Sequence, residues 1–145
     1  MQSAEELNEK KLKFSPEATR ELAVLTKALR EILSNSLTAM ETEELLLAGS
    51  VEPLEQVIDG LTKTIRSHHI DRLTKGICTQ EMGFILGDIL TNLERVSDHC
   101  SNLAVAIIEI AAGSFDVHEY LSSVKAGQGE YRERFEGYAR RFCLE

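Results

Sequence analysis

The sequence is poor in the residues that interrupt helices and in the patterns that build sheets. It has two prolines and no tryptophan among 145 residues. Its β-branched residues do not alternate with polar ones, as they would in half-buried strands. Apolar residues instead recur at steps of three and four, the spacing of one helix face. The sequence therefore predicts an all-α protein.

Several features that carry chemistry are also missing. The cysteines, Cys78, Cys100 and Cys143, are odd in number and scattered, which favours reduced thiols over a disulfide framework. No glycine-rich phosphate loop, nucleophile elbow or paired-histidine zinc motif occurs. No apolar run approaches the roughly 18 residues of a membrane span, and the first dozen residues are polar. We therefore expect neither a transmembrane segment nor a signal peptide.

The charge balance is acidic. The chain has 24 acidic and 16 basic residues, for a net charge of −8. Nucleic-acid binding needs a clustered basic face, so nucleic acid is excluded as an expected partner. General electrostatic attraction would not bind free phosphate either. If the protein handles phosphate, a metal ion must mediate the contact or another part must bind it.

Helix-capping and helix-ending residues divide the chain. We expect one domain over residues 15–143, preceded by a lead-in at 1–14. Ser15-Pro16-Glu17 is a typical helix start, and Lys75-Gly76 a typical helix end. Three long helices are predicted: the first at about 16–41, the second beginning at 50–53 and ending at 75, and the third at 79–113. A short fourth helix at 131–142 follows a polar connection at 127–129.

Three long helices with short connections pack as an antiparallel three-helix bundle. The first helix has a broad apolar repeat, made of Leu22, Leu25, Leu29, Ile32, Leu33, Leu37 and Met40. The short C-terminal amphipathic helix carries four aromatic residues, Tyr131, Phe135, Tyr138 and Phe142. They suit a role in sealing the bundle or in forming a dimer seam, and we favour the bundle.

The segment LERVSDHCSN, residues 93–102, places Glu94 and Asp98 four residues apart on one helix face. At about 100° per residue, Glu94 lies at the flank of the apolar stripe and Asp98 points away from it. Two interpretations remain open. The face is either a solvated polar surface, held by pairs such as Asp98 with Arg95, or a ligand site.

The second helix supplies two more acids. If the chain reverses near Ile77, antiparallel packing brings residues 55–60 level with residues 94–98. Glu55 and Asp59 occupy that level, on the polar side of their helix. Four carboxylates in one groove would repel one another unless a cation screened them, and oxygen-rich clusters suit hard divalent ions. We therefore predict a metal site formed by Glu55, Asp59, Glu94 and Asp98, for Mg, Mn, Fe or Zn.

The histidines do not complete this site. His68 falls on the core-facing side of the second helix and is predicted to be a buried, hydrogen-bonded residue. His99 follows Asp98 but points to the opposite flank from Glu94, so that one ion cannot easily bind both. His118 is expected on the surface.

The decapeptide resembles the E-x-x-x-D signature helix of PhoU-like domains, which regulate phosphate uptake. The resemblance extends to residues 11–18, 51–79, 90–109 and 116–121, which are similar to the C-terminal region of bacterial sodium/phosphate cotransporter family proteins. In that family a cytoplasmic PhoU-like helical domain follows a membrane transporter domain. The resemblance implies metal binding by the acids of this motif, Glu94 and Asp98, with Asp59 a weaker assignment.

The resemblance also implies a function. The chain would be a regulatory or accessory domain on the cytoplasmic side of the membrane, with the transmembrane domain of a sodium-dependent phosphate transporter as its partner. PhoU-like proteins commonly carry two three-helix repeats with one motif each, whereas this chain has one of each. A complete pair of motifs therefore implies a homodimer.

Two other functions are possible on the sequence. One is a stand-alone metal-dependent helical enzyme, of di-iron or phosphohydrolase type. Such sites need inward-facing Glu-x-x-His pairs or histidine–aspartate clusters, which this chain lacks. General acid–base catalysis by two carboxyl groups needs different pKa values for the two groups, and burial of one group is what separates them. An exposed carboxylate pair lacks this burial. The other is a dimerisation bundle without a ligand. We predict a protein that is not an enzyme.

Overall fold

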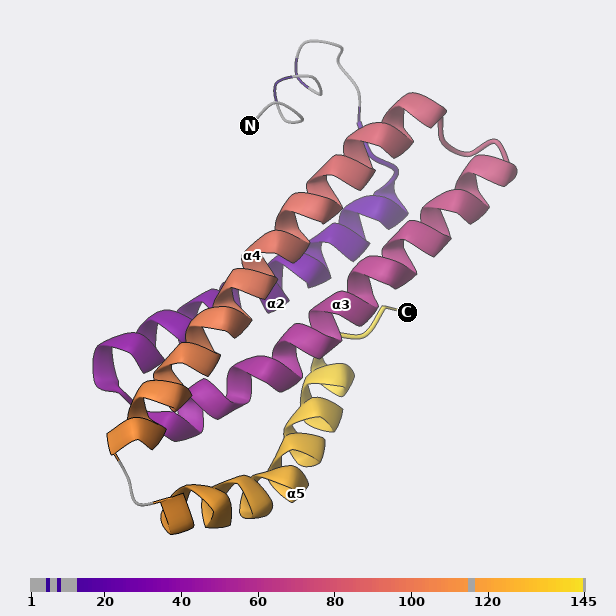
Figure 1. Ribbon diagram of the computed structural model, residues 1–145. Coiled ribbons are helices and arrows are strands. Elements are labelled where there is room, and N and C mark those ends of the chain that lie inside the picture. Colours follow the sequence, from indigo (N-terminus) through magenta and orange to yellow (C-terminus); the bar gives the residue numbers. More distant parts are fainter. Residues whose placement is uncertain (1–4, 6–7, 9–12, 115–116, 145) are drawn as a thin grey trace.

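The computed structural model describes residues 5, 8, 13–114 and 117–144, without the side chains of residues 114–128. Its helices are α2 (Pro16–Thr42), α3 (Leu45–Thr74), α4 (Gln80–Ser114) and α5 (Val117–Arg141). The described residues include no strand, which agrees with the all-α prediction. Figure 1 shows α2, α3 and α4 side by side, with α5 turning back along α3. None of these helices, over the described residues, has the length and apolarity needed to cross a bilayer.

The first helix begins and ends close to its predicted bounds. Ser15 caps α2, because its Oγ accepts a hydrogen bond from the backbone N–H of Ala18 at 3.1 Å. The helix ends where Glu43 adopts a left-handed conformation, with φ of 55°. The predicted lead-in at residues 1–14 lies mostly outside the described residues.

The second helix starts earlier than predicted, at Leu45 rather than near 50–53, and Pro53 lies inside it. An interior proline removes one backbone hydrogen bond and costs a helix about 3 kcal/mol. Ala48 and Val51, in the turns before the proline, are 1% and 0% exposed. The stabilisation gained by burying these turns outweighs the cost of the proline. No local pattern in the sequence predicts this burial.

The turn between α3 and α4 is as predicted. The N–H of Lys75 bonds to the carbonyl of Asp71, and Gly76 has φ of +71°, the left-handed conformation that favours glycine. Thr79 then accepts a hydrogen bond from the N–H of Met82 at 3.3 Å at the start of α4. This short turn fixes the antiparallel alignment of α3 and α4.

The fourth helix is longer than predicted. Residues 127–129, predicted to be a polar connection, are helical, and α5 begins at Val117. Extending an existing helix is much easier than starting one, so glycines are tolerated next to a well-anchored segment. The chain is anchored at the C-terminal end of α5.

That anchor is formed by two aromatic residues and two arginines. Phe142 is 7% exposed in the core, and its ring stacks on Tyr138 at 6.5 Å between centroids. Arg141 donates two hydrogen bonds to the carboxylate of Glu31 on α2, at 2.9 and 2.6 Å, and Arg134 donates to the carbonyl of Leu46 at 2.9 Å. Tyr138 and Phe142 therefore seal the bundle, as we favoured, whereas Tyr131 and Phe135 are 37% and 36% exposed.

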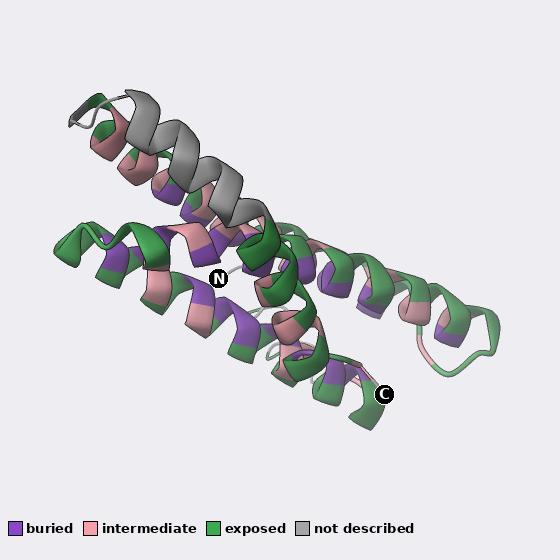
Figure 2. Ribbon diagram, turned by 90° about the horizontal axis from the view of Figure 1, so that it is seen from below, coloured by how far each residue is buried: buried purple, intermediate pink, exposed green. Residues whose placement is uncertain are grey.

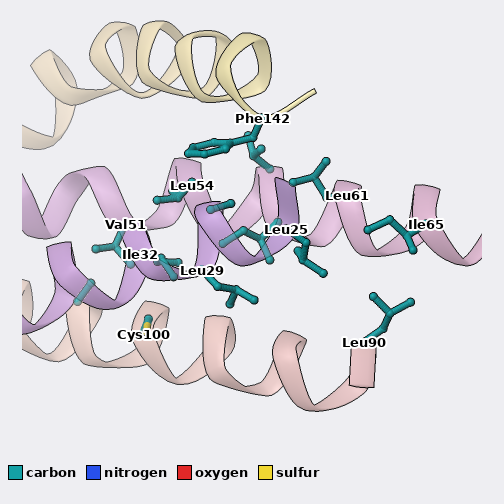
Figure 3. Close-up of a cluster of buried hydrophobic side chains, with 14 of the residues drawn as sticks. Leu25, Leu29, Ile32, Val51, Leu54, Leu61, Ile65, Leu90, Cys100 and Phe142 are labelled. Carbon is teal, nitrogen blue, oxygen red and sulfur yellow. The ribbon is translucent and has the colours of Figure 1, made fainter. Parts of the chain in front are cut away.

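The core lies where the apolar stripes of α2, α3 and α4 meet. Figure 2 shows the buried residues on the inner faces of these helices. Figure 3 shows side chains from all three helices in one cluster, with Phe142, the residue after α5, closing it. The largest fully buried aliphatic side chains are Leu25, Ile32, Leu54, Ile58, Ile65, Leu86 and Leu90.

A buried ion pair joins α2 to α3. Glu21 and Arg72 are 5% and 4% exposed, and Nη1 of Arg72 donates to the Glu21 carboxylate. His68 Nδ1 donates to the other Glu21 oxygen at 2.7 Å. The prediction that His68 is hydrogen-bonded is confirmed. The prediction that it is buried was wrong, since its side chain is 41% exposed. Its partner Glu21 is the group that the bundle buries.

We predict that Arg72→Ala lowers the free energy of unfolding by about 3–5 kcal/mol, because it leaves the Glu21 carboxylate buried without its cation. Urea denaturation followed by circular dichroism measures this change. The double variant Glu21→Ala/Arg72→Ala should lose less than the two single variants together. A loss below about 1 kcal/mol for Arg72→Ala would contradict the importance of this pair.

Candidate functional site

A pocket of about 290 Å³ lies between α3 and α4, and we call it the acidic groove. It contains all four acids that the sequence singled out, two from each helix. The convergence of Glu55 and Asp59 with Glu94 and Asp98 is therefore confirmed as geometry. The lining residues are Glu55, Ile58, Asp59, Thr91, Glu94, Arg95, Ser97 and Asp98.

Glu94 is held from across the helix interface. Its Oε1 accepts a hydrogen bond from the Thr62 hydroxyl, and its Oε2 accepts one from Nη2 of Arg66, each at 2.9 Å. The Glu94 side chain is 29% exposed, which fits its predicted place at the flank of the apolar stripe. These bonds fix the carboxylate and neutralise part of its charge. Arg66 of α3 is thus the cation that pairs with the motif, and Arg95, which also lines the groove, forms no ion pair with a described residue.

Asp98 and Asp59 are more open. Asp98 is exposed and forms no ion pair or hydrogen bond with any described residue. Asp59 accepts a bond from Lys63 Nζ at 2.8 Å, but this pair is exposed, with 38% of the Asp59 side chain accessible. Exposed pairs contribute little and exchange readily. Both carboxylates are therefore available to a ligand.

Glu55 is the acid of the groove whose pKa is raised. Burial and, in decreasing order of size, the charges of Glu52, Asp98 and Asp59 together raise its pKa from 4.5 to about 6. Gln56 opposes this by donating a hydrogen bond to the carboxylate at 3.0 Å. The charges that raise this pKa are all carboxylates, so part of the shift reflects repulsion among the acids in and beside the groove. A bound cation would relieve it.

Ser97 adds a second sign of an incomplete site. It lines the groove and is 2% exposed, yet its hydroxyl oxygen has no hydrogen-bond partner among the described residues. An unpaired buried hydroxyl costs about 1–3 kcal/mol. A hydrated ion in the groove would provide a partner.

The sequence analysis missed the residues that support the site. Thr62, Arg66 and Ser97 were not singled out, and neither was the bond that Ser101 donates to Glu52 at 2.6 Å. The signal was present: the same alignment that placed residues 55–60 beside 94–98 puts Thr62 next to Glu94. A helical wheel alone gave no reason to choose these polar residues over others.

The four carboxylates do not form a closed chelate. Among the described residues, no group of three or more His, Cys, Asp or Glu side chains lies close enough to hold a metal ion. Nor does the groove include an imidazole: His99 is exposed and His69 lies against Cys78, with 3.5 Å between Nδ1 and Sγ. The side chain of His118 is outside the described residues. The donors are oxygens on two helices, an arrangement that suits an ion keeping several of its waters.

Comparison with known proteins points in one direction. Residues 22–107 match the PhoU domain family. The chain is also 31% identical over 121 residues to the phosphate-specific transport system accessory protein PhoU homolog 1 of Thermotoga maritima. The alignment covers 83% of this chain and 51% of the relative, so the chain spans about half the length of that protein. No solved structure matches the chain significantly.

We predict that Glu55→Gln stabilises the fold above pH 6 and not in acid. The folded chain holds the Glu55 proton to a pKa of about 6, against an ordinary value of 4.5. Ionisation of Glu55 therefore destabilises the folded state as the pH rises through this window. Solvent screening limits the gain at neutral pH to about 1 kcal/mol. Urea denaturation at a series of pH values measures it, and an equal gain at pH 4.5 and above pH 6 would contradict the assignment.

Proposed function

Because this chain belongs to the PhoU family, we propose that it is a regulatory or accessory domain in phosphate transport. The printed name of its Thermotoga relative, an accessory protein of a phosphate-specific transport system, supports this assignment. We propose further that its partner is the transmembrane domain of a sodium-dependent phosphate transporter and that it acts on the cytoplasmic side. The similarity of residues 51–79 and 90–109 to cotransporter family proteins supports the finer proposal.

The acidic groove is the proposed regulatory site, and the observation that carries this is its uncompensated charge. Four carboxylates share the groove, Glu55 has a raised pKa, and the buried Ser97 hydroxyl has no partner among the described residues. Because the donors are oxygens without an imidazole, Mg²⁺ or Mn²⁺ suits the groove better than Zn²⁺. Iron ranks below Mg²⁺ and Mn²⁺, because the groove offers no imidazole ligand.

The bound ion would act through surface charge. Hydrogen bonds already tie α3 to α4 on either side of the groove, from Thr62 and Arg66 to Glu94 and from Ser101 to Glu52. These ties oppose a large rearrangement of the bundle when an ion binds. The ion instead adds two positive charges to a groove whose four carboxylates form ion pairs, among the described residues, with Lys63 and Arg66 alone. A transporter domain that contacts this surface would then bind differently with and without the ion.

Catalysis is not part of the proposal. Among the described residues, the Ser97 hydroxyl has no hydrogen-bonded base to activate it as a nucleophile. We also propose a homodimer, since the chain has one three-helix unit and its relative is about twice as long as the aligned part.

We predict that Mn²⁺ binds the wild-type chain and that Asp98→Asn weakens binding at least about 10-fold, because it removes a carboxylate that has no competing partner among the described residues. Isothermal titration calorimetry measures the affinity. Asp71→Asn is the matched control, since Asp71 is an exposed acid of α3 paired with Lys75 outside the groove. Arg66→Gln should tighten binding by freeing Glu94.

Absence of heat in the wild type, or equal weakening by Asp98→Asn and Asp71→Asn, would refute the metal site. The metal-loaded protein should not hydrolyse a chromogenic phosphate ester. Steady turnover that Asp98→Asn abolishes would favour the enzyme interpretation instead.

In cells, we predict that Asp98→Asn in the chain's own gene uncouples phosphate uptake from phosphate supply, because the regulatory ion no longer binds. Uptake of labelled phosphate in phosphate-rich medium should then differ severalfold from wild type. The Asp71→Asn strain should take up phosphate as the wild type does. Identical uptake in all three strains would contradict a regulatory role for the groove.

A further inference from the structure

Helix α2 has an apolar stripe that its own bundle leaves open. Leu33, Leu37 and Met40 are 40%, 50% and 49% exposed. They are spaced by four and then three residues, which is the spacing of a coiled-coil seam. The sequence analysis assigned these residues to the core repeat of the first helix, but the bundle covers only part of that repeat.

The position of the stripe on α2 explains why it stays open. Ile32 is 0% exposed and faces the core. The next residue, Leu33, lies about 100° to one side of it, and the preceding residue, Glu31, about 100° to the other. Arg141 of α5 binds Glu31, so this contact of α5 with α2 lies on the flank opposite to the stripe.

Two charged residues flank the stripe. Arg30 precedes it and Glu41 follows it, both exposed on the outer side of α2. Neither forms an ion pair with another described residue, whereas the neighbouring Glu31 does. The stripe thus has a cation at one end and an anion at the other.

We propose that a second copy of this chain covers the stripe, with the two α2 helices packed antiparallel about a two-fold axis near residues 35–36. In this arrangement Leu33 packs against Leu37 of the partner subunit, and each Arg30 faces Glu41 of the partner subunit. A parallel pair would instead place like charges opposite one another. A two-fold interface uses each contact twice, so two ion pairs flank a seam of leucines.

This inference rests on the homodimer of the proposed function and names its surface. The stripe and the acidic groove share no residue, since the groove is lined by α3 and α4. Dimerisation through α2 therefore does not use the residues that line the metal site.

Sedimentation velocity over a range of protein concentrations tests the seam. The wild type should be a reversible dimer. Leu37→Glu places two carboxylates in the seam and should raise the dimer Kd at least about 100-fold. Phe84→Glu is the matched control, because Phe84 is an exposed apolar residue of α4, 80% accessible, outside the stripe. It should leave the Kd unchanged.

A charge exchange tests the orientation. Arg30→Glu and Glu41→Arg should each raise the Kd about 10-fold, and the double variant should restore it. Circular dichroism verifies that each variant is folded. A monomeric wild type, dissociation by Phe84→Glu but not by Leu37→Glu, or a double variant no tighter than the single ones overturns the proposal. A Mn²⁺ titration of Leu37→Glu separates the two claims, since the groove should bind the ion whether or not the seam exists.

Discussion

The structure depends on the antiparallel packing of α3 against α4. Ile58 and Ile65 of α3 and Leu90 of α4 are fully buried in the core that joins them. Burying aliphatic surface of this size stabilises a fold by about 1.5–3 kcal/mol per side chain. That stabilisation fixes the alignment of the two helices, and the alignment forces their carboxylates into one groove. The repulsion among the acids is a consequence of how the core packs.

This constraint also explains what each polar contact does. Thr62 and Arg66 hold Glu94, and Ser101 holds Glu52, so that the acids near the helix interface are fixed by bonds across it. Asp98 and Asp59 sit farther out and stay available. The groove therefore combines a rigid inner rim with an open outer rim. An ion bound there, as we propose, would exchange without disturbing the core, which fits the proposed regulatory role.

Much of this architecture could be predicted because it follows from local signals. The Ser15-Pro16 start and the Lys75-Gly76 end set the lengths and the reversal, and these placed Glu55 and Asp59 beside Glu94 and Asp98. The errors arose where tertiary packing overrides local preference. Pro53 lies inside α3 because the turn before it is buried, and α5 continues through residues 127–129 from an anchored end. The bonds to Glu94 and the isolation of Ser97 depend on side-chain positions that no spacing specifies.

The most direct test of the central claim, that the acidic groove binds a divalent cation, is paramagnetic line broadening. Substoichiometric Mn²⁺ added to isotopically labelled protein broadens the amide resonances of nearby residues in a heteronuclear spectrum. The account predicts selective broadening at residues 55–59 and 94–98, the two segments that face each other across the groove. Broadening centred on the acids of α2, or spread evenly over the exposed carboxylates, would contradict it.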